Sequence, residues 1–244
     1  LQRGVVAVLD VGSSKIGCLI LKFEGLEEKI EADGVGSLAG QSGFQVIGSA
    51  LTRSRGMEYG EIVSMPETER AIRTALQSAQ KLANSRVDHV IACISGGSPR
   101  SYGLEGAVDI KTGIVDDNDI ADVLGSCGIP AYGSDREVLH AQPVNFSLDH
   151  RTGLSDPRGQ IGKKLSVDMH MLTVKEKTIH DLAYCLKRCD LELAGVASAS
   201  YASALSSLIE DEKELGAACI DLGGGSTNLA IFWKKHMIFA ETIK

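Results

Sequence analysis

The sequence has few of the features that mark membrane, nucleic-acid-binding or secreted proteins. Only 5% of its 244 residues are aromatic, and no apolar run reaches the roughly 18 residues of a membrane span. The N-terminus shows no charged leader followed by an apolar segment. Acidic residues outnumber basic ones, 32 to 25, and the net charge of -7 repels nucleic acid and anionic surfaces. These absences predict a cytoplasmic globular protein that has no nucleic acid partner.

No common catalytic or metal-binding pattern is present either. The six cysteines are scattered and lie mostly in apolar segments, so reduced core thiols explain them best. Cys185 and Cys189 stand four residues apart on an expected helix, but no second pair has the spacing of a zinc site. The six histidines lack a nucleophile or acid at a telling spacing, and neither common glycine-rich nucleotide motif occurs. We therefore predict no catalytic residue.

Two short segments near opposite ends of the chain repeat each other. Each follows an apolar run and precedes another, which is typical of a strand, a tight turn and a second strand. Glycine and serine let a backbone approach an anion closely and point several N–H groups at it. The pair therefore predicts two turns that bind one polyphosphate. The two segments are Asp10-Val11-Gly12-Ser13-Ser14-Lys15 and Asp221-Leu222-Gly223-Gly224-Gly225-Ser226-Thr227.

The residue types in these turns suggest individual roles. An Asp at the end of a strand can hold hydrated Mg²⁺ against phosphate oxygens, which relieves the desolvation cost of the carboxylate. Asp10 and Asp221 are therefore the predicted metal residues. The alternative is that each turn is an ordinary hairpin, in which the Asp caps its own turn. The residues predicted to bind the cofactor are Asp10, Gly12, Ser13, Ser14, Lys15, Asp221, Gly223, Gly224, Gly225, Ser226, Thr227 and Asn228.

Apolar periodicity predicts an α/β protein with a small insertion. Turn residues are dense between residues 102 and 165, where Pro143 suits an edge strand or a bulge. The acidic run at residues 210–214 is expected to be a solvated loop. A capping box at Ser64 is expected to begin the first long helix. Strands are predicted at residues 5–9, 16–23, 45–51, 87–94, 138–139, 144–146, 166–174, 191–197, 217–222, 228–233 and 237–242. Helices are predicted at residues 64–82, 117–124, 175–189 and 200–208.

The two turns resemble the phosphate-1 and phosphate-2 loops of the actin, Hsp70 and sugar-kinase superfamily. Within that superfamily the sequence is most similar to the FtsA family of bacterial cell-division proteins. The likeness follows the family's order over essentially the whole chain. It is carried by Ser54-Arg55-Gly56-Met57, Ile94-Ser95-Gly96, Asp156-Pro157-Arg158-Gly159-Gln160-Ile161-Gly162, and Glu210-Asp211-Glu212-Lys213-Glu214-Leu215-Gly216 leading into Ile220-Asp221-Leu222-Gly223-Gly224-Gly225.

This resemblance implies an actin-like ATPase fold, of the ribonuclease H-like type, with an inserted small α+β subdomain. It places the first core subdomain at residues 1–84 and 166–198, and the FtsA-type interaction subdomain at residues 85–165. The second core subdomain would begin at residue 199 and continue to residue 244. The second lobe is therefore expected to be incomplete in this chain, so that ATP binds weakly or not at all.

The resemblance also implies a role in division. FtsA-type proteins bind ATP with Mg²⁺, self-associate, and recruit later division proteins through the inserted subdomain. They link the FtsZ ring to the inner face of the cell membrane at the division site. The FtsZ-binding part of the second lobe and the C-terminal membrane helix are expected outside these 244 residues.

The stretch that joins the two lobes predicts slow ATP hydrolysis at most. Relatives that hydrolyse ATP efficiently carry a Gln or Glu there to orient the attacking water. The corresponding segment here is Ala197-Ser198-Ala199-Ser200-Tyr201. Two alternatives remain open: a pilus-assembly actin homologue, and a kinase or phosphatase of the same superfamily. An enzyme would need a catalytic carboxylate or Gln and a substrate pocket, which the sequence does not indicate.

Overall fold

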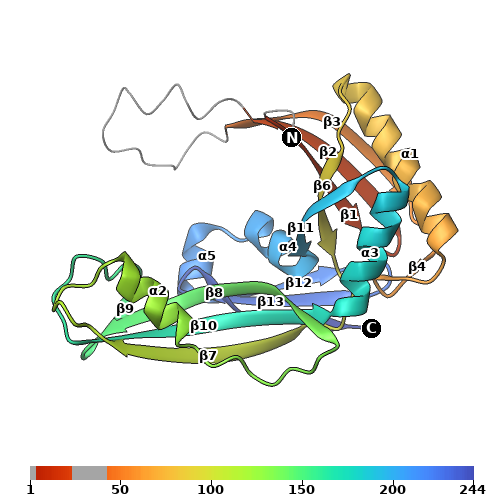
Figure 1. The fold of residues 1–244 in the computed structure, drawn as a ribbon. Helices are drawn as coiled ribbons and strands as arrows, with labels where there is room; N and C mark the ends of the chain where they lie inside the picture. The colour runs from red at the N-terminus through yellow and green to blue at the C-terminus, as the bar shows by residue number, and fades with distance from the viewer. Residues whose placement is uncertain (1–3, 24–42) are drawn as a thin grey trace. The chain divides into compact units, whose positions relative to one another are not determined.

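The computed structural model describes residues 4–23 and 43–244 (Figure 1). These residues form two compact units, each assembled from separate parts of the chain. The first contains Leu1–Ser95, Thr178–Ala199 and Gly223–Ser226. The second contains Gly96–Lys177, Ser200–Leu222 and Thr227–Lys244. Within the described part of the chain, no helix is long and apolar enough to cross a membrane.

The first unit is built on a five-stranded sheet with the strand order β11-β6-β1-β2-β3. The first three strands along the chain form an antiparallel meander, and β6 and β11 then run parallel to β1. The apolar runs explain these strands, because alternate residues of β1 and β2 are fully buried. The strands are β1 (Val5–Val11), β2 (Lys15–Phe23), β3 (Phe44–Arg53), β6 (His89–Ile94) and β11 (Glu192–Ser198).

Two helices lie side by side on one face of this sheet (Figure 1). Helix α1 (Met65–Ala83) buries a stripe of alanine, isoleucine and leucine against β2 and β3. Helix α3 (Glu176–Arg188) buries Leu182, Cys185 and Leu186. The predicted capping box of α1 is wrong: Ser64 is the N-cap residue, but its side chain makes no cap hydrogen bond. The buried Thr68 hydroxyl instead bonds the carbonyl oxygens of residues 55, 56 and 64.

A short hairpin between β3 and α1 was not predicted from the sequence. Strands β4 (Met57–Glu58) and β5 (Glu61–Ile62) are joined by Tyr59 and Gly60, whose φ angles are 51° and 75°. Positive φ at both positions is the geometry of a type I′ turn. The sequence did not predict the turn because Asn-Gly or Asp-Gly usually marks it, and Tyr rarely adopts a positive φ.

The second unit begins with a four-stranded sheet of order β7-β10-β8-β9, in which neighbouring strands are antiparallel. Helix α2 (Asp117–Gly125) covers one face with an apolar cluster that includes Val123, Phe146 and Leu165. Pro143 lies at a shift in the pairing of β8 with β10, as predicted for a bulge. The strands are β7 (Arg100–Asp109), β8 (Arg136–Leu148), β9 (Arg151–Leu154) and β10 (Lys164–Lys175).

The strand pairing moves both ends of the expected insertion. The sequence predicts residues 85–165, but β6 belongs to the five-stranded sheet of the first unit. Strand β10, expected in the first core subdomain, pairs with β7 and β8. The physical reason is that β10 completes the sheet of the insertion, where it is the central partner of two strands.

A second antiparallel meander of order β12-β13-β14 completes the second unit. Its apolar side chains Ala230, Phe232 and Met237 cluster with Leu172 of β10 and Ala204 of helix α4 (Ala199–Ser207). Residues 210–214, expected as a loop, lie in helix α5 (Glu210–Leu215), so that prediction is wrong. The Glu212 carboxylate accepts a hydrogen bond from the Ile209 N–H and begins this helix. The strands are β12 (Ala217–Leu222), β13 (Thr227–Trp233) and β14 (His236–Ile243).

Candidate functional site

The first predicted turn joins β1 to β2. The Gly12 N–H donates to the Lys15 carbonyl oxygen at 3.1 Å, and Asp10 pairs with Gly17 across the strands. The Ser13 hydroxyl oxygen accepts the Gly60 N–H at 2.8 Å. The turn is therefore held from outside by the β4–β5 hairpin, which the sequence did not reveal. A hydroxyl that accepts one bond can still donate its proton to an anion.

The end of β3 supports the same turn. The Ser14 carbonyl oxygen accepts the Ser54 N–H at 3.0 Å. Lys15 pairs with Arg53 across β2 and β3, and both side chains are exposed. Two cations beside a Gly/Ser turn favour a bound anion. The predicted role of Lys15 is therefore consistent with its position, and Arg53 is a cation that the sequence did not single out.

The second predicted turn joins β12 to β13 and has the same backbone geometry. The Gly223 N–H donates to the Ser226 carbonyl oxygen at 3.0 Å. Asp221 pairs with Asn228, which is the same spacing as that of Asp10 and Gly17. The repeat in the sequence is therefore a repeat in hydrogen bonding and in strand register.

Side chains from several segments surround the Asp221 carboxylate in the second unit. The Ser203 hydroxyl of α4 donates to Oδ2 at 3.3 Å, and the Asn228 amide donates to the same oxygen at 3.4 Å. Asn228 is only 2% exposed, and its amide oxygen accepts the Thr242 hydroxyl at 2.8 Å. The strand register therefore presents the carboxylate in a fixed orientation. Ser203 and Thr242 were missed because their roles depend on contacts made far along the chain.

The glycine run of the second turn belongs to the first unit, where it meets the first turn. A Cβ atom on Gly224 would lie 2.5 Å from Ser14 Cβ, and one on Gly225 would lie 2.7 Å from Ser13 Cβ. No side chain fits at either distance, because non-bonded carbon atoms approach to about 3.5 Å. The structure therefore brings together Ser13, Ser14, Gly224 and Gly225. It also gives the glycine run a reason that needs no ligand, namely contact between the two turns.

The remaining predicted residues divide between the units. Gly12 and Lys15 lie with the first turn, Ser226 is buried in the first unit, and Thr227 begins β13 in the second. Asp10 belongs to the first unit and Asp221 to the second.

Cys93 lies beside Asp10, and Cys219 lies beside Asp221. Burial, and next the charge of the neighbouring Asp, raise the pKa of both thiols. Both thiols are therefore poor nucleophiles.

Each turn, taken by itself, carries the residue types that suit phosphate oxygens and a hydrated divalent cation. Hydroxyls and backbone N–H groups suit phosphate oxygens, and an Asp at the strand end suits the oxygen-rich shell that Mg²⁺ prefers. At the β11–α4 junction, the Tyr201 ring stacks on Phe232 with a centroid distance of 6.0 Å and lies 5.1 Å from the His140 ring. Tyr201 is therefore a packing residue.

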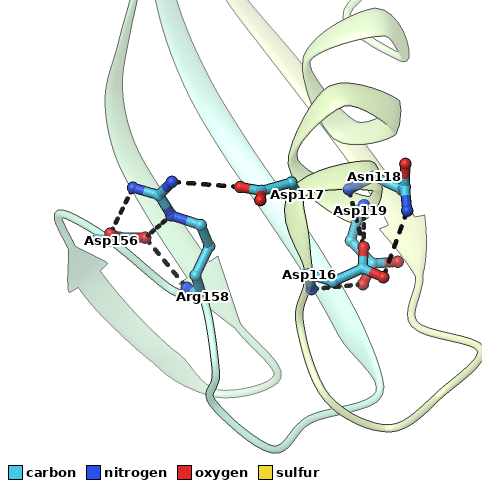
Figure 2. Close-up of polar contacts among 6 residues, drawn as sticks. All are labelled: Asp116, Asp117, Asn118, Asp119, Asp156 and Arg158. Carbon is cyan, nitrogen blue, oxygen red and sulfur yellow. Dashed lines mark hydrogen bonds and ion pairs between the residues drawn. The ribbon is translucent and has the colours of Figure 1, made fainter.

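One segment that carried the family resemblance has a structural role in the insertion. Figure 2 shows Arg158 bonding Asp156 through Nε at 2.8 Å and through Nη2 at 2.7 Å, and Asp117 through Nη1 at 3.2 Å. These bonds lower the pKa of the Asp156 carboxyl. Asp117 lies in the first turn of α2, whose N-cap Asp116 accepts the N–H groups of Asn118 and Asp119. The segment therefore ties the loop after β9 to α2.

The sheet order of the first unit, with a meander followed by two parallel strands, defines an actin-like ATPase fold. Two solved structures share it. The PilM-PilN type IV pilus biogenesis complex matches with a TM-score of 0.62 and 11% identity, covering 98% of this chain and 61% of that chain. The ethanolamine utilization protein EutJ from Carboxydothermus hydrogenoformans matches with a TM-score of 0.50 and 12% identity, covering 99% of this chain and 52% of that chain. The predicted fold class is confirmed.

Sequence comparison confirms the narrower resemblance. Residues 96–173 match the SHS2 domain inserted in FtsA. The chain is 35% identical to the cell division protein FtsA of Rhizobium meliloti, over 98% of this chain and 53% of that protein. It is 33% identical to FtsA of Pseudomonas aeruginosa, over 95% of this chain and 52% of that protein. It is 25% identical to FtsA of Escherichia coli K12, over 95% of this chain and 51% of that protein. The chain therefore spans about half the length of these curated relatives, and its similarity to them extends over nearly all of its own length.

Proposed function

We propose that this chain is the part of an FtsA-type division protein that senses ATP and passes its state to self-association. The observation that carries the proposal is the repeated turn: the same hydrogen bond closes both copies, and an Asp stands at the same register in each. Similarity to FtsA over nearly the whole chain supports the cell-division role.

ATP with Mg²⁺ is the cofactor whose chemistry fits these residues. Bound Mg²⁺ would neutralise phosphate charge, and Asp10 and Asp221 are the residues that would hold its water shell. The N–H groups of Gly224 and Gly225, with the hydroxyls of Ser13, Ser14, Ser226 and Thr227, would bind phosphate oxygens, and Lys15 would balance their charge. Gly12 and Gly223 would keep the two turns closed through the hydrogen bonds of their own N–H groups. The Asn228 amide orients the Asp221 carboxylate.

Slow hydrolysis at most follows from the start of α4. Residues 197–201 carry no Gln or Glu that could orient an attacking water. The one large polar side chain there, Tyr201, packs on Phe232. Turnover faster than about one per second by this chain or by a longer form would favour the kinase or phosphatase alternative.

The proposed partners follow the FtsA resemblance. The insertion at residues 96–173 would contact later division proteins and other copies of the chain. A complete division protein, of which this chain would be about half, would link FtsZ to the inner face of the membrane at the division site.

The proposal is tested by titrating the chain with Mg·ATP, and separately with Mg·tripolyphosphate, up to millimolar concentration in an NMR experiment. We expect shifts confined to the amides of the two turns, and loss of these shifts when Mg²⁺ is omitted. Asp10→Asn and Asp221→Asn should each weaken the response at least tenfold. Asp117→Asn, which makes the same charge change in the insertion, is the matched control and should respond like the parent.

The outcomes test the nucleotide site and the control of self-association separately. No turn-localised shift with either ligand, in this chain and in a longer form that includes the rest of the second lobe, would contradict the nucleotide site. Binding at the turns without any change in sedimentation would contradict the control of self-association while leaving the nucleotide site intact.

A further inference from the structure

Two cysteines meet where α3 ends against α1. The end of α3 is a Schellman motif: the Leu191 N–H donates to the Leu186 carbonyl at 3.0 Å, and the Asp190 N–H donates to the Lys187 carbonyl at 3.1 Å. Asp190 has the left-handed φ of 61° that this motif requires. Cys189 is therefore the C-cap residue, and Cys185 lies one turn before it on the buried face of α3.

A bond between the two sulfurs needs a small movement of Cys189 toward Cys185. Residues four apart in a helix have Cα atoms about 6 Å apart, within the range of about 4.4–6.8 Å found in disulfides. Their Cβ atoms are about 5–6 Å apart and have to approach to about 4.5 Å. Cys189 is the C-cap residue, one position beyond α3, so its movement disturbs only the bonds at the end of the helix, namely that of its own N–H to the Leu186 carbonyl at 2.8 Å and the two of the Schellman motif. Both thiols are buried, Cys185 at 0% and Cys189 at 5% exposure.

The surroundings of Cys189 act on its thiol in both directions. The protonated thiol donates to the Glu69 carbonyl oxygen on α1 at 3.7 Å, and the Glu69 charge also favours the thiol, whereas the charge of Arg73 favours the thiolate. One turn further along α1, the Arg73 guanidinium bonds the Glu69 carboxylate and the Arg188 carbonyl oxygen. The hydrogen bond with Cys185, and next the charge of Arg73, lower the pKa of Cys189 against the effect of burial. The same hydrogen bond and burial raise the pKa of Cys185.

A cavity gives small molecules access to this pair. It has a volume of about 550 Å³, and Cys189 forms part of its wall. Cavities of this size accept small ligands. The polar side chains around it come from α1, from the segment before β6 and from the end of α3; they are Arg73, Gln77, Gln80, Arg86, Asp88 and Asp190.

The other described thiols have a different environment. Burial raises the pKa of Cys18 to about 11 and also raises that of Cys127. Cys93 and Cys219 each lie beside an Asp, as described above. Among the described cysteines, Cys185 and Cys189 are the only pair of neighbouring thiols that also has an arginine and a cavity beside it.

We propose that Cys185 and Cys189 form a dithiol site that small hydroperoxides oxidise to a disulfide. The Cys189 thiolate attacks the terminal peroxide oxygen; an S–O bond forms, the O–O bond breaks, and the other oxygen leaves with a proton as water or alcohol. The Cys185 sulfur then attacks the Cys189 sulfenic acid; the S–S bond forms, the S–O bond breaks, and hydroxide leaves with the Cys185 proton as water. Each disulfide consumes one hydroperoxide and releases one alcohol or water and one further water.

The positions of Lys187 and Arg188 between the two cysteines make the test direct. The chain is treated with hydrogen peroxide, remaining thiols are blocked with N-ethylmaleimide, and trypsin separates residues 178–187 from residues 189–213. We expect these two peptides to remain joined by a disulfide, with the other four cysteines alkylated. Free, alkylated peptides 178–187 and 189–213 after oxidation would overturn the proposal.

Variants show which cysteine reacts with the peroxide and which one closes the disulfide. Cys185→Ala should leave Cys189 as a sulfenic acid that reacts with dimedone, and Cys189→Ala should leave Cys185 alkylatable. Arg73→Gln should slow the reaction several-fold and move its pH profile upward, because the thiolate loses its nearest cation. Cys127→Ala, in the insertion, is the control and should form the disulfide like the parent. Equal oxidation of all six cysteines would contradict a specific site.

Discussion

The two meanders, β1–β2–β3 and β12–β13–β14, have the same strand order and the same turn, but different groups hold the turn and the Asp beside it. Both turns are closed by a Gly N–H to the carbonyl three residues later, at 3.1 Å and 3.0 Å. Behind the first meander, α1 supplies an apolar layer. Behind the second lies the apolar cluster of Ala230, Phe232 and Met237, and at its turn the polar side chains of Asn228 and Ser203 bond Asp221.

The residues opposite the two Asp side chains show the difference most clearly. Gly17 faces Asp10 and offers no side chain, whereas Asn228 faces Asp221 and donates to it. The first turn is held by backbone N–H groups of Ser54 and Gly60 that come from outside the meander. The same backbone turn is therefore stabilised in two different ways. The β4–β5 hairpin holds the first turn, and side chains within the second unit hold Asp221 beside the second turn.

The largest predicted effect is a loss of stability in acid in the second unit, which contains the second meander. His170 of β10 is 3% exposed, neither ring nitrogen has a hydrogen-bond partner among the residues that the structure describes, and burial lowers its pKa to about 4 from 6.5. The unfolded state therefore binds more protons between these values, so stability is full above pH 6.5 and falls toward pH 4. The loss should be about 3 kcal/mol.

Chemical denaturation at several pH values measures this effect, and hydrogen exchange locates it. His170→Leu should flatten the dependence, although the nearby His140, whose pKa burial also lowers, keeps part of it. His150→Gln, at an exposed position, is the control. A parent protein equally stable at pH 7 and pH 4.5 would refute the prediction.

Removal of the side chain opposite Asp221 should be the next largest effect. Asn228→Ala deletes a donor to Asp221 and the acceptor of Thr242 in a buried site, which should cost about 2 kcal/mol. The paired control is Gly17→Ala in the first meander. A Cβ there would lie 3.7 Å from Leu51 and 3.8 Å from Asp10, which are ordinary contacts. Equal losses in urea denaturation would mean that the meanders do not differ as described.

The turns themselves should differ in their tolerance of alanine. A Cβ on Gly223 would lie 2.7 Å from the Ser226 carbonyl oxygen, and one on Gly12 would lie 3.1 Å from that of Lys15. Gly223→Ala should therefore cost about 1–3 kcal/mol, as overpacking does, and Gly12→Ala less. Thermal melts of both variants measure the order. The reverse order would show that the second turn relaxes more easily than the first.

The smallest predicted effect concerns the outside support of the first turn. Ser13→Ala removes the acceptor of the Gly60 N–H and should cost about 1 kcal/mol. Ser14→Ala leaves the backbone carbonyl that accepts the Ser54 N–H and is the matched control. Denaturation and the exchange rate of the Gly60 amide are the measurements. An unchanged Gly60 exchange rate in Ser13→Ala would contradict the support by this hydroxyl.

Much of the secondary structure could be predicted because it depends on local patterns. The apolar runs around both turns, the stripe of α3 and the bulge at Pro143 are confirmed near their predicted places. The missed elements depend on partners. Helix α5 is a charged segment whose Lys213 is 8% exposed and pairs with Glu210 at 2.6 Å. The β4–β5 hairpin lacks the common turn residues, and its Gly60 N–H has a partner 47 residues away.

The sequence by itself determined the repeated turns, the residue types within them and the resemblance to FtsA, because glycine, serine and aspartate act through short-range geometry. Only the tertiary structure decided which strands share a sheet: β6 pairs with β1 in parallel, and β10 joins β7 and β8. It also decided that glycines 224 and 225 meet Ser14 and Ser13. Such pairings connect segments far apart in the chain, and their free energy depends on contacts that no local pattern records.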